Sequence, residues 1–354
     1  MIKKNNFVRF SLALLDWWED NGRKDLPWQR NPTPYRVWVS EIMLQQTQVS
    51  TVMGYFDRFM SAFPDVQALA QAEQDRVLHL WSGLGYYARA RNMQRAAREI
   101  CERFGGALPA DIDALESLPG IGRSTAGAIL ALAMDQRQPI LDGNARRVLA
   151  RVFGVSGWPG DTAVNRELWL LAEACTPAHR AAHYTQAIMD LGASVCTRRN
   201  AHCTACPLSP QCIAHQRAVV DQIPAPRPKR KRPKREVVLV MVVREDGAVL
   251  LEKRPSGGVW GGLWGFPETT GVDEVPAWCQ TQVGSVPRRM QVRAIVHHGF
   301  THFDLSMTPV EAHIASPPER AMEGDRWLWY KVHKPAAVGL AAPVARLLET
   351  FGEQ

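Results

Sequence analysis

The chain of 354 residues contains no apolar run long enough to cross a membrane and no recognisable export signal. Lysines precede apolar residues at the N-terminus, but Arg9 interrupts that stretch and no small-residue cleavage site follows it. We interpret residues 1–21 as an amphipathic helix, and expect a cytoplasmic protein, nucleoid-associated if bacterial, without a membrane partner. The seven cysteines then meet a reducing environment, where clustered cysteines are more often metal ligands than disulfides.

Lysine is absent from residues 25–228, and internal repeats are absent from the whole chain. The first absence leaves that stretch without an amine nucleophile. Apolar residues make up 46% of the chain and charged residues 22%, which is ordinary for a globular protein. Because 354 residues exceed what one hydrophobic core usually organises, two domains are expected.

The net charge of +7 equals the charge of one short segment, residues 226–235, with the sequence PRPKRKRPKR. Its three prolines exclude a helix, so we expect an extended linker. The linker is either a soluble hinge or a tether that contacts phosphates. It divides a helical domain, residues 1–225, from a second domain, residues 236–354.

The two predicted domains differ in their apolar pattern. Helical periodicity dominates residues 1–225, and Thr33-Pro34 predicts the start of one long helix through residues 37–60. Short β-branched or alternating runs dominate residues 236–354. We therefore predict an all-α domain followed by an α+β domain.

Four cysteines fall within seventeen positions, in the spacing Cys196-x6-Cys203-x2-Cys206-x5-Cys212. Four thiolates suit either a structural zinc or a [4Fe–4S] cluster, and the spacing alone does not choose between them. The loop also contains two prolines and little core-forming sequence, which argues against four unrelated buried cysteines.

A glycine-rich turn, LPGIGRSTAG over residues 118–127, lies between two predicted helices. Gly120 and Gly122 bracket one apolar residue, which is typical of a tight hairpin whose backbone N–H groups face a phosphate at a helix start. A single turn of this kind is common in proteins without that role. It would bind DNA without regard to base sequence.

Two carboxylates stand in contexts suited to catalysis. Glu41 shares a helical face with Val37 and Leu44, so burial is expected to raise its pKa towards that of a general acid. A buried ion pair with an arginine is the alternative for Glu41. Asp142 follows two apolar residues and precedes a helix, where it is expected to cap the helix and stay ionised.

These segments together resemble the endonuclease III superfamily of helix-hairpin-helix DNA glycosylases. The segments VWVSEIMLQQTQV, LWSGLGYYARARN, LPGIGRSTAGAI, ILDGN and the four-cysteine loop look like its MutY branch, and the resemblance covers essentially the whole chain. It implies a [4Fe–4S] cluster rather than zinc, and Glu41 and Asp142 as the catalytic pair, with Asn144 orienting the site. The second domain resembles a MutT-like Nudix fold, whose pyrophosphate-hydrolysing set of carboxylates is not matched after Gly262.

The resemblance also implies further site residues. Trp28 lines an adenine pocket, while Gln46 and Tyr86 act as wedges beside the mispair. The lyase branch has a lysine where this chain has Ser124, which implies a glycosylase without an efficient strand-cleaving step. Ser124 is expected beside the sugar, or alternatively as a helix cap.

In the MutY branch a Phe-Ser-His tip of the second domain contacts 8-oxoguanine. Here the matching residues are Phe300, Thr301 and His302, with a threonine in place of the serine. The implied partner is duplex DNA that carries adenine opposite 8-oxoguanine or guanine, bound by a monomer. A glycosylase-lyase for oxidised pyrimidines and a catalytically silent DNA-binding protein remain the alternatives.

Overall fold

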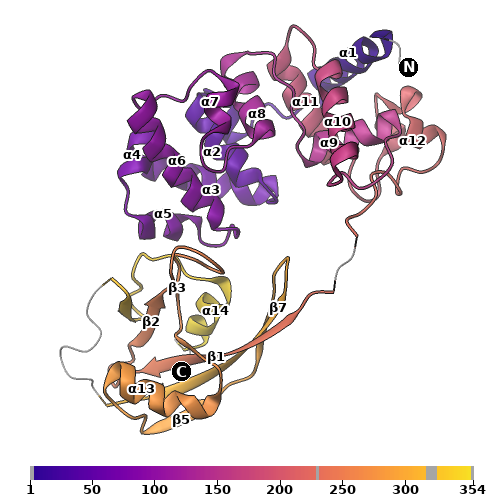
Figure 1. Ribbon diagram of the computed structural model, residues 1–354. Helices are drawn as coiled ribbons and strands as arrows, with labels where there is room; N and C mark the ends of the chain where they lie inside the picture. The colour runs from indigo at the N-terminus through magenta and orange to yellow at the C-terminus, as the bar shows by residue number, and fades with distance from the viewer. Residues whose placement is uncertain (1–3, 229–230, 316–324, 352–354) are drawn as a thin grey trace. The chain divides into compact units, whose positions relative to one another are not determined.

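The computed structural model describes residues 4–228, 231–315 and 325–351, and the chain forms two compact units (Figure 1). The first unit comprises Met1–Gln71 and Asn92–Lys229, and the second comprises Ala72–Arg91 and Arg230–Gln354. None of the helices in the described ranges is long and apolar enough to span a membrane.

The first unit is helical, as predicted. Its helices, with α6 continuing from the second unit, are α1 (Lys4–Asn21), α2 (Pro34–Leu44), α3 (Val49–Ala62), α4 (Val66–Gln71), α6 (Ala88–Phe104), α7 (Ile112–Glu116), α8 (Arg123–Met134), α9 (Gly143–Phe153), α10 (Thr162–Cys175), α11 (Ala181–Ser194) and α12 (Ile213–Gln216). A core of buried side chains such as Phe10, Leu149, Tyr184 and Leu191 joins α1, α9 and α11.

The single long helix predicted for residues 37–60 is wrong, because the chain leaves the helical path between α2 and α3. Gln46 adopts a left-handed conformation with φ of 58°, and Gln48 is the extended cap residue of α3. No glycine or proline marks the break, and the apolar periodicity runs through it. The break turns residues 45–50 into a wall of the cavity described below.

The second unit is built on a mixed eight-stranded sheet, which agrees with the predicted α+β class. Its elements are α5 (Gln74–Trp81), β1 (Lys234–Val243), β2 (Val249–Lys253), β3 (Trp264–Gly265), β4 (Glu268–Thr269), α13 (Val275–Val283), β5 (Arg289–Val292), β6 (Val296–Gly299), β7 (Asp304–His313), β8 (Trp327–Tyr330) and α14 (Ala342–Phe351). The main strand order is β3-β2-β1-β7-β5, and β1 and β7 are parallel while the other pairs are antiparallel.

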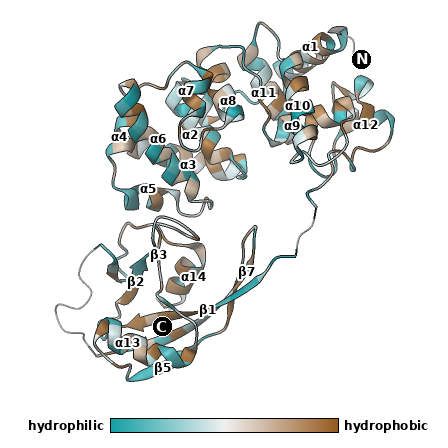
Figure 2. Cartoon of the chain, in the orientation of Figure 1, coloured by the Kyte–Doolittle hydropathy of each residue, from teal (hydrophilic) through white to brown (hydrophobic). Residues whose placement is uncertain are grey.

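The predicted linker, residues 226–235, overlaps the start of this sheet. Strand β1 begins at Lys234 and passes from hydrophilic to hydrophobic residues along its length (Figure 2). Residues 229 and 230 of the linker lie outside the described residues.

Helix α8 packs closely against the segment that leads into α9. A Cβ atom on Gly127 would lie 2.5 Å from the backbone oxygen of Pro139, whereas a Cβ on Gly54 in α3 would meet no atom within 4 Å. Glycine at position 127 therefore sets how closely residues 139–142 approach α8.

We predict opposite effects of alanine at these two helical glycines. Gly127→Ala should lower the free energy of unfolding, because overpacking costs about 1–3 kcal/mol and outweighs a helix-propensity gain of about 1 kcal/mol. Gly54→Ala, the matched control, should raise stability by up to about 1 kcal/mol. Urea denaturation followed by circular dichroism measures both, and equal stabilities of the two variants would contradict the close approach at Gly127.

Candidate active site and cysteine cluster

One cavity of the first unit brings together six of the residues predicted from sequence to form the site. Its volume is about 1160 Å³, large for a small-molecule site. The six are Trp28, Glu41, Gln46, Ser124, Asp142 and Asn144. The predicted catalytic residues, which are far apart in sequence, therefore line one shared space.

Glu41 faces the cavity from α2, together with Val37 and Leu44 as its helical spacing predicted. Burial, and then the charge of Asp142, raise the pKa of Glu41 to about 8. Among the described residues no arginine offsets these two effects on Glu41. The alternative of a structural ion pair therefore does not account for Glu41.

Asp142 is the N-cap residue of α9, and its carboxylate accepts a hydrogen bond of 2.8 Å from the backbone N–H of Ala145. Burial raises the pKa of Asp142 more than this bond and the nearby charges of Arg147 and Arg146 lower it. The cap was expected to keep the carboxylate ionised, but the structure shows that burial is the larger influence on its pKa. Both carboxyl groups therefore have raised pKa values, and the charge of Asp142 contributes to that of Glu41.

Ser124 is hydrogen-bonded to the residue just before Asp142. Its hydroxyl accepts a hydrogen bond of 3.0 Å from the backbone N–H of Leu141. The N-cap position of α8 is Gly122, which has no side-chain cap bond, so Ser124 does not have the capping role considered as the alternative. The hydroxyl also lines the cavity.

Arg147 was missed by the sequence analysis. Its guanidinium donates to the side-chain oxygen of Asn144 at 2.8 Å and to the backbone oxygens of Gly192 and Cys196 at 2.5 and 2.7 Å. It therefore joins the start of α9 to the end of α11 and to the cysteine loop. The contacts with Gly192 and Cys196 are long-range, and no local motif marks this arginine among its neighbours.

A second wall of the cavity was also missed. Lys24 lines it, immediately before the lysine-free stretch, and its ammonium group lies 4.9 Å from the ring centre of Trp18. The Lys24 amine donates to the backbone oxygen of Glu19. His183 stacks on Trp18 at 5.0 Å, and both also line the cavity. Lys24 lies one residue before the stretch 25–228 that contains no lysine.

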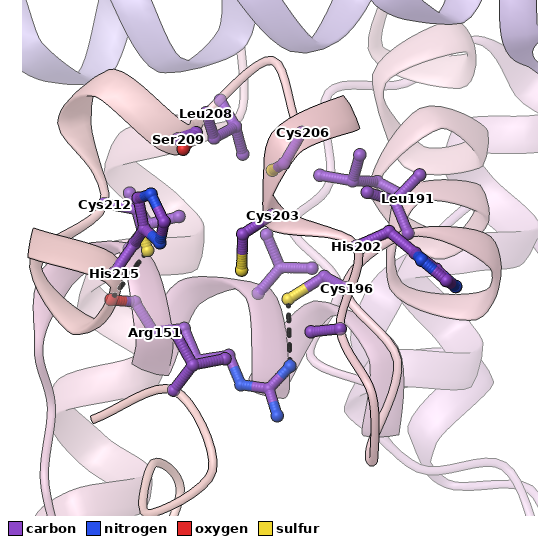
Figure 3. Close-up of a pocket in the computed structure, with 15 residues that line it drawn as sticks. Arg151, Leu191, Cys196, His202, Cys203, Cys206, Leu208, Ser209, Cys212 and His215 are labelled. Carbon is purple, nitrogen blue, oxygen red and sulfur yellow. Dashed lines mark hydrogen bonds between the residues drawn. The ribbon is translucent and has the colours of Figure 1, made fainter. Parts of the chain in front are cut away.

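The four clustered cysteines surround a separate, largely apolar cavity of the same unit (Figure 3). Arg151 donates to the sulfur of Cys196 at 3.3 Å, and the thiol of Cys212 donates to the backbone oxygen of Arg151 at 3.4 Å. Burial raises the pKa of Cys206 to about 11 and also raises that of Cys203. In the described part of the chain, no three His, Cys, Asp or Glu side chains are grouped to hold one metal ion.

The predicted phosphate-binding turn has the expected backbone conformation. Gly120 has a φ of 81°, and a Cβ there would lie 2.9 Å from the Cβ of Asn92. Ile121 between the two glycines is buried, and Gly122 begins α8 with open space around its Cα. The turn therefore needs glycine at position 120 and leaves the backbone accessible at position 122.

The remaining predicted site residues belong to the second unit. Phe300 stacks on Phe303 at 4.6 Å in the turn between β6 and β7, and Thr301 and His302 are exposed at that turn. Tyr86 is about half exposed and has a left-handed backbone with φ of 47°.

Comparison with known proteins also divides the chain into two parts, but it assigns residues 72–91 to the first part and not to the second. Residues 39–174 match the HhH-GPD superfamily of base excision DNA repair proteins, and residues 238–350 match the NUDIX domain family. Adenine DNA glycosylase of Buchnera aphidicola from Acyrthosiphon pisum is 37% identical over 342 residues, which cover 97% of each chain. The mouse and human adenine DNA glycosylases are 36% and 34% identical, over 94% of this chain and 76% and 72% of theirs.

Solved structures also resemble part of this chain. A thermostable thymine-DNA glycosylase aligns with a TM-score of 0.54 at 25% identity, over 61% of this chain and all of the other. Endonuclease III in a non-covalent DNA complex aligns with a TM-score of 0.53 at 19% identity, over 62% and 99% of the two chains. The second of these likenesses concerns the fold alone.

We predict that Glu41→Gln stabilises the protein in a pH-dependent way. The Glu41 pKa is raised from 4.5 to about 8, so the unfolded chain loses this proton first and the wild type loses stability as pH rises through that window. Glutamine cannot ionise, so the variant should be more stable near pH 8 by roughly 1–3 kcal/mol and no more stable near pH 4. Urea denaturation at both pH values measures the difference, and a variant less stable near pH 8 would show that the carboxylate is paired.

Proposed function

The chain belongs to the adenine DNA glycosylase family, and from this membership we propose that it excises adenine paired with 8-oxoguanine or guanine. It is a DNA N-glycosylase of base excision repair, with a helical HhH-GPD domain followed by a Nudix-fold domain. The product would be an abasic site in duplex DNA. The observation that carries the proposal is that Glu41 and Asp142 line one cavity, where burial and the charge of Asp142 raise the pKa of Glu41.

In the proposed mechanism the adenosine leaves the base stack and enters the cavity, because its glycosidic bond is inaccessible in the duplex. Trp28 lines the part of the cavity that takes the base. Glu41, protonated at neutral pH, donates its proton to adenine N7, so that the base leaves as a neutral molecule.

Asp142 faces the positive charge that develops on the sugar as the bond breaks. Asn144 orients this end of the site, held by Arg147, and Ser124 fixes the backbone before Asp142. Water then attacks the sugar and releases the abasic product.

A strand-cleaving lyase is the second candidate that the family resemblance raises. It requires an amine at the sugar, and position 124 is a serine whose hydroxyl is already hydrogen-bonded. Lys24 lines the cavity, but its amine donates to the backbone oxygen of Glu19. These contacts favour base release without strand cleavage.

The proposed DNA contacts of a monomer divide between the two units. The turn at Gly120 and Gly122 binds the phosphate backbone through its N–H groups, and Gln46 enters the duplex beside the mispair. Tyr86 and the tip formed by residues 300–302 contact the base opposite adenine. The Nudix-fold domain then serves recognition, since Glu268 pairs with Arg254 and the described residues hold no cluster of metal-binding carboxylates.

The chemistry of the donor set supports a [4Fe–4S] cluster held by Cys196, Cys203, Cys206 and Cys212. All four thiols line one cavity, and the family resemblance favours a cluster over zinc there. Such a cluster would supply four metal–thiolate bonds that order the loop. No step of base release uses it.

We predict that single-turnover adenine release falls as pH rises through about 8. Glu41 is the acid in this scheme, and its protonated form is depleted above its pKa.

Glu41→Gln should bind the duplex but lose base release roughly a hundredfold or more. A variant that retains more than a tenth of the wild-type rate would remove Glu41 from the acid role.

For opposite-base recognition, we predict that Thr301→Val lowers the ratio of adenine release opposite 8-oxoguanine to release opposite guanine. Loss of one hydrogen bond of about 1 kcal/mol gives roughly a fivefold lower ratio. Thr301→Ser, which keeps the hydroxyl, is the control and should preserve the ratio. A normal ratio in Thr301→Val would show that the threonine hydroxyl does not contact 8-oxoguanine.

Cysteine substitution tests the cofactor. Cys212→Ser should lose iron and the brown colour of a thiolate-bound cluster, while Cys175→Ser, at a buried cysteine in α10 outside the cavity, should keep both. Iron analysis and visible absorbance of anaerobically purified protein measure this. Colourless wild-type protein with one zinc per chain would contradict the cluster.

A further inference from the structure

The sequence places the segment Ala72–Arg91 in the helical domain, but its contacts place it in the second unit. It lies inside the HhH-GPD match, residues 39–174, yet its contacts group it with residues 231–351 in the second unit. The segment contains α5 and the turn that carries Tyr86. This division was not predicted from the sequence.

The N-terminal end of the segment is tied to the sheet by an ion pair. The Lys253 ammonium of β2 lies 3.1 Å from the Asp75 carboxylate, and the indole N–H of Trp264 in β3 donates to the same carboxylate at 3.2 Å. One carboxylate thus holds two adjacent strands against α5.

The C-terminal end of the segment is tied to two loops of the second unit. The Tyr87 hydroxyl donates to the backbone oxygen of Leu340 at 3.0 Å, and the Arg91 guanidinium donates to the backbone oxygen of Gly261 at 2.5 Å. These bonds flank the Tyr86 turn on its C-terminal side.

Hydrogen bonds and a cation–π contact hold the turn internally. Arg89 donates to the backbone oxygens of Leu84 and Gly85 at 3.0 and 3.1 Å, and the indole N–H of Trp81 also donates to Gly85. The Arg89 guanidinium lies 5.6 Å from the ring centre of Tyr86. These contacts connect the Tyr86 turn to the anchored ends of the segment.

We propose that the second unit positions Tyr86, with Asp75 and Tyr87 as its positioning residues. Tyr86 and the tip of residues 300–302 then form a single reader, meaning a site that recognises the base opposite adenine. Both belong to the second unit. This inference rests on the proposed function, because it assigns the reader to 8-oxoguanine. Under this proposal, the same domain that recognises the lesion also fixes the backbone of the wedge residue Tyr86.

The test uses the full chain with Asp75→Ala and Tyr87→Phe, each alone and combined with Tyr86→Ala. Arg288→Ala is the matched control, because it breaks an ion pair with Glu245 in the same unit but away from the segment. Two quantities are measured: amide hydrogen exchange of residues 82–91 in the free protein, and the ratio of single-turnover adenine release opposite 8-oxoguanine and opposite guanine.

Both positioning variants are expected to speed exchange in residues 82–91 and to lower the ratio roughly three- to tenfold. In the Tyr86→Ala background they should lower it no further, since they act through that ring. The control should change neither quantity. Unchanged exchange, or a full additional loss of the ratio without Tyr86, would overturn the inference.

A wild-type protein without preference for 8-oxoguanine would instead reject the proposed function. The exchange measurement needs no substrate, so it still decides whether the second unit holds the turn.

Discussion

The site depends on burying two carboxyl groups, those of Glu41 and Asp142, in the wall of one cavity. Glu41 and Asp142 each lose hydration, and the charge of one raises the pKa of the other. Glu41, with its pKa raised to about 8, is therefore suited to hold a proton near neutral pH. The surrounding contacts serve this arrangement. The cap bond from Ala145, the Ser124 hydroxyl and the Arg147 guanidinium all fix the start of α9, which carries Asp142.

One face of α9 also organises the cysteine loop. Arg147 and Arg151 are one helical turn apart, and both donate to Cys196, one to its backbone oxygen and the other to its sulfur. Helix α9 therefore presents the catalytic carboxylate at its start and the cysteine loop along its side. Disorder of the loop would remove the contact of each arginine with Cys196, while Arg147 would keep its bonds to Asn144 and Gly192.

The sequence analysis succeeded where a local signal carried the information. The apolar periodicity of each half of the chain identified a helical and an α+β domain. Helical spacing placed Glu41 on one face with Val37 and Leu44, and the position of Asp142 before a helix identified it as a cap. It failed where contacts are long-range. Nothing in the neighbourhood of Gln46 marks the break between α2 and α3. The partners of Arg147 and the membership of residues 72–91 are set by chain segments far away in sequence.

The interleaving of the two units affects the order in which the protein can be completed during synthesis. Segment Ala72–Arg91 is made early, but its partners begin at residue 231. At ordinary translation speeds the ribosome needs roughly ten to thirty seconds to cover the residues between them. During that interval α5 has no sheet to pack against. Residues 72–91 can therefore become ordered only after the last third of the chain has been synthesised. A protein truncated by premature termination would therefore lack both its second domain and a properly seated piece of its first.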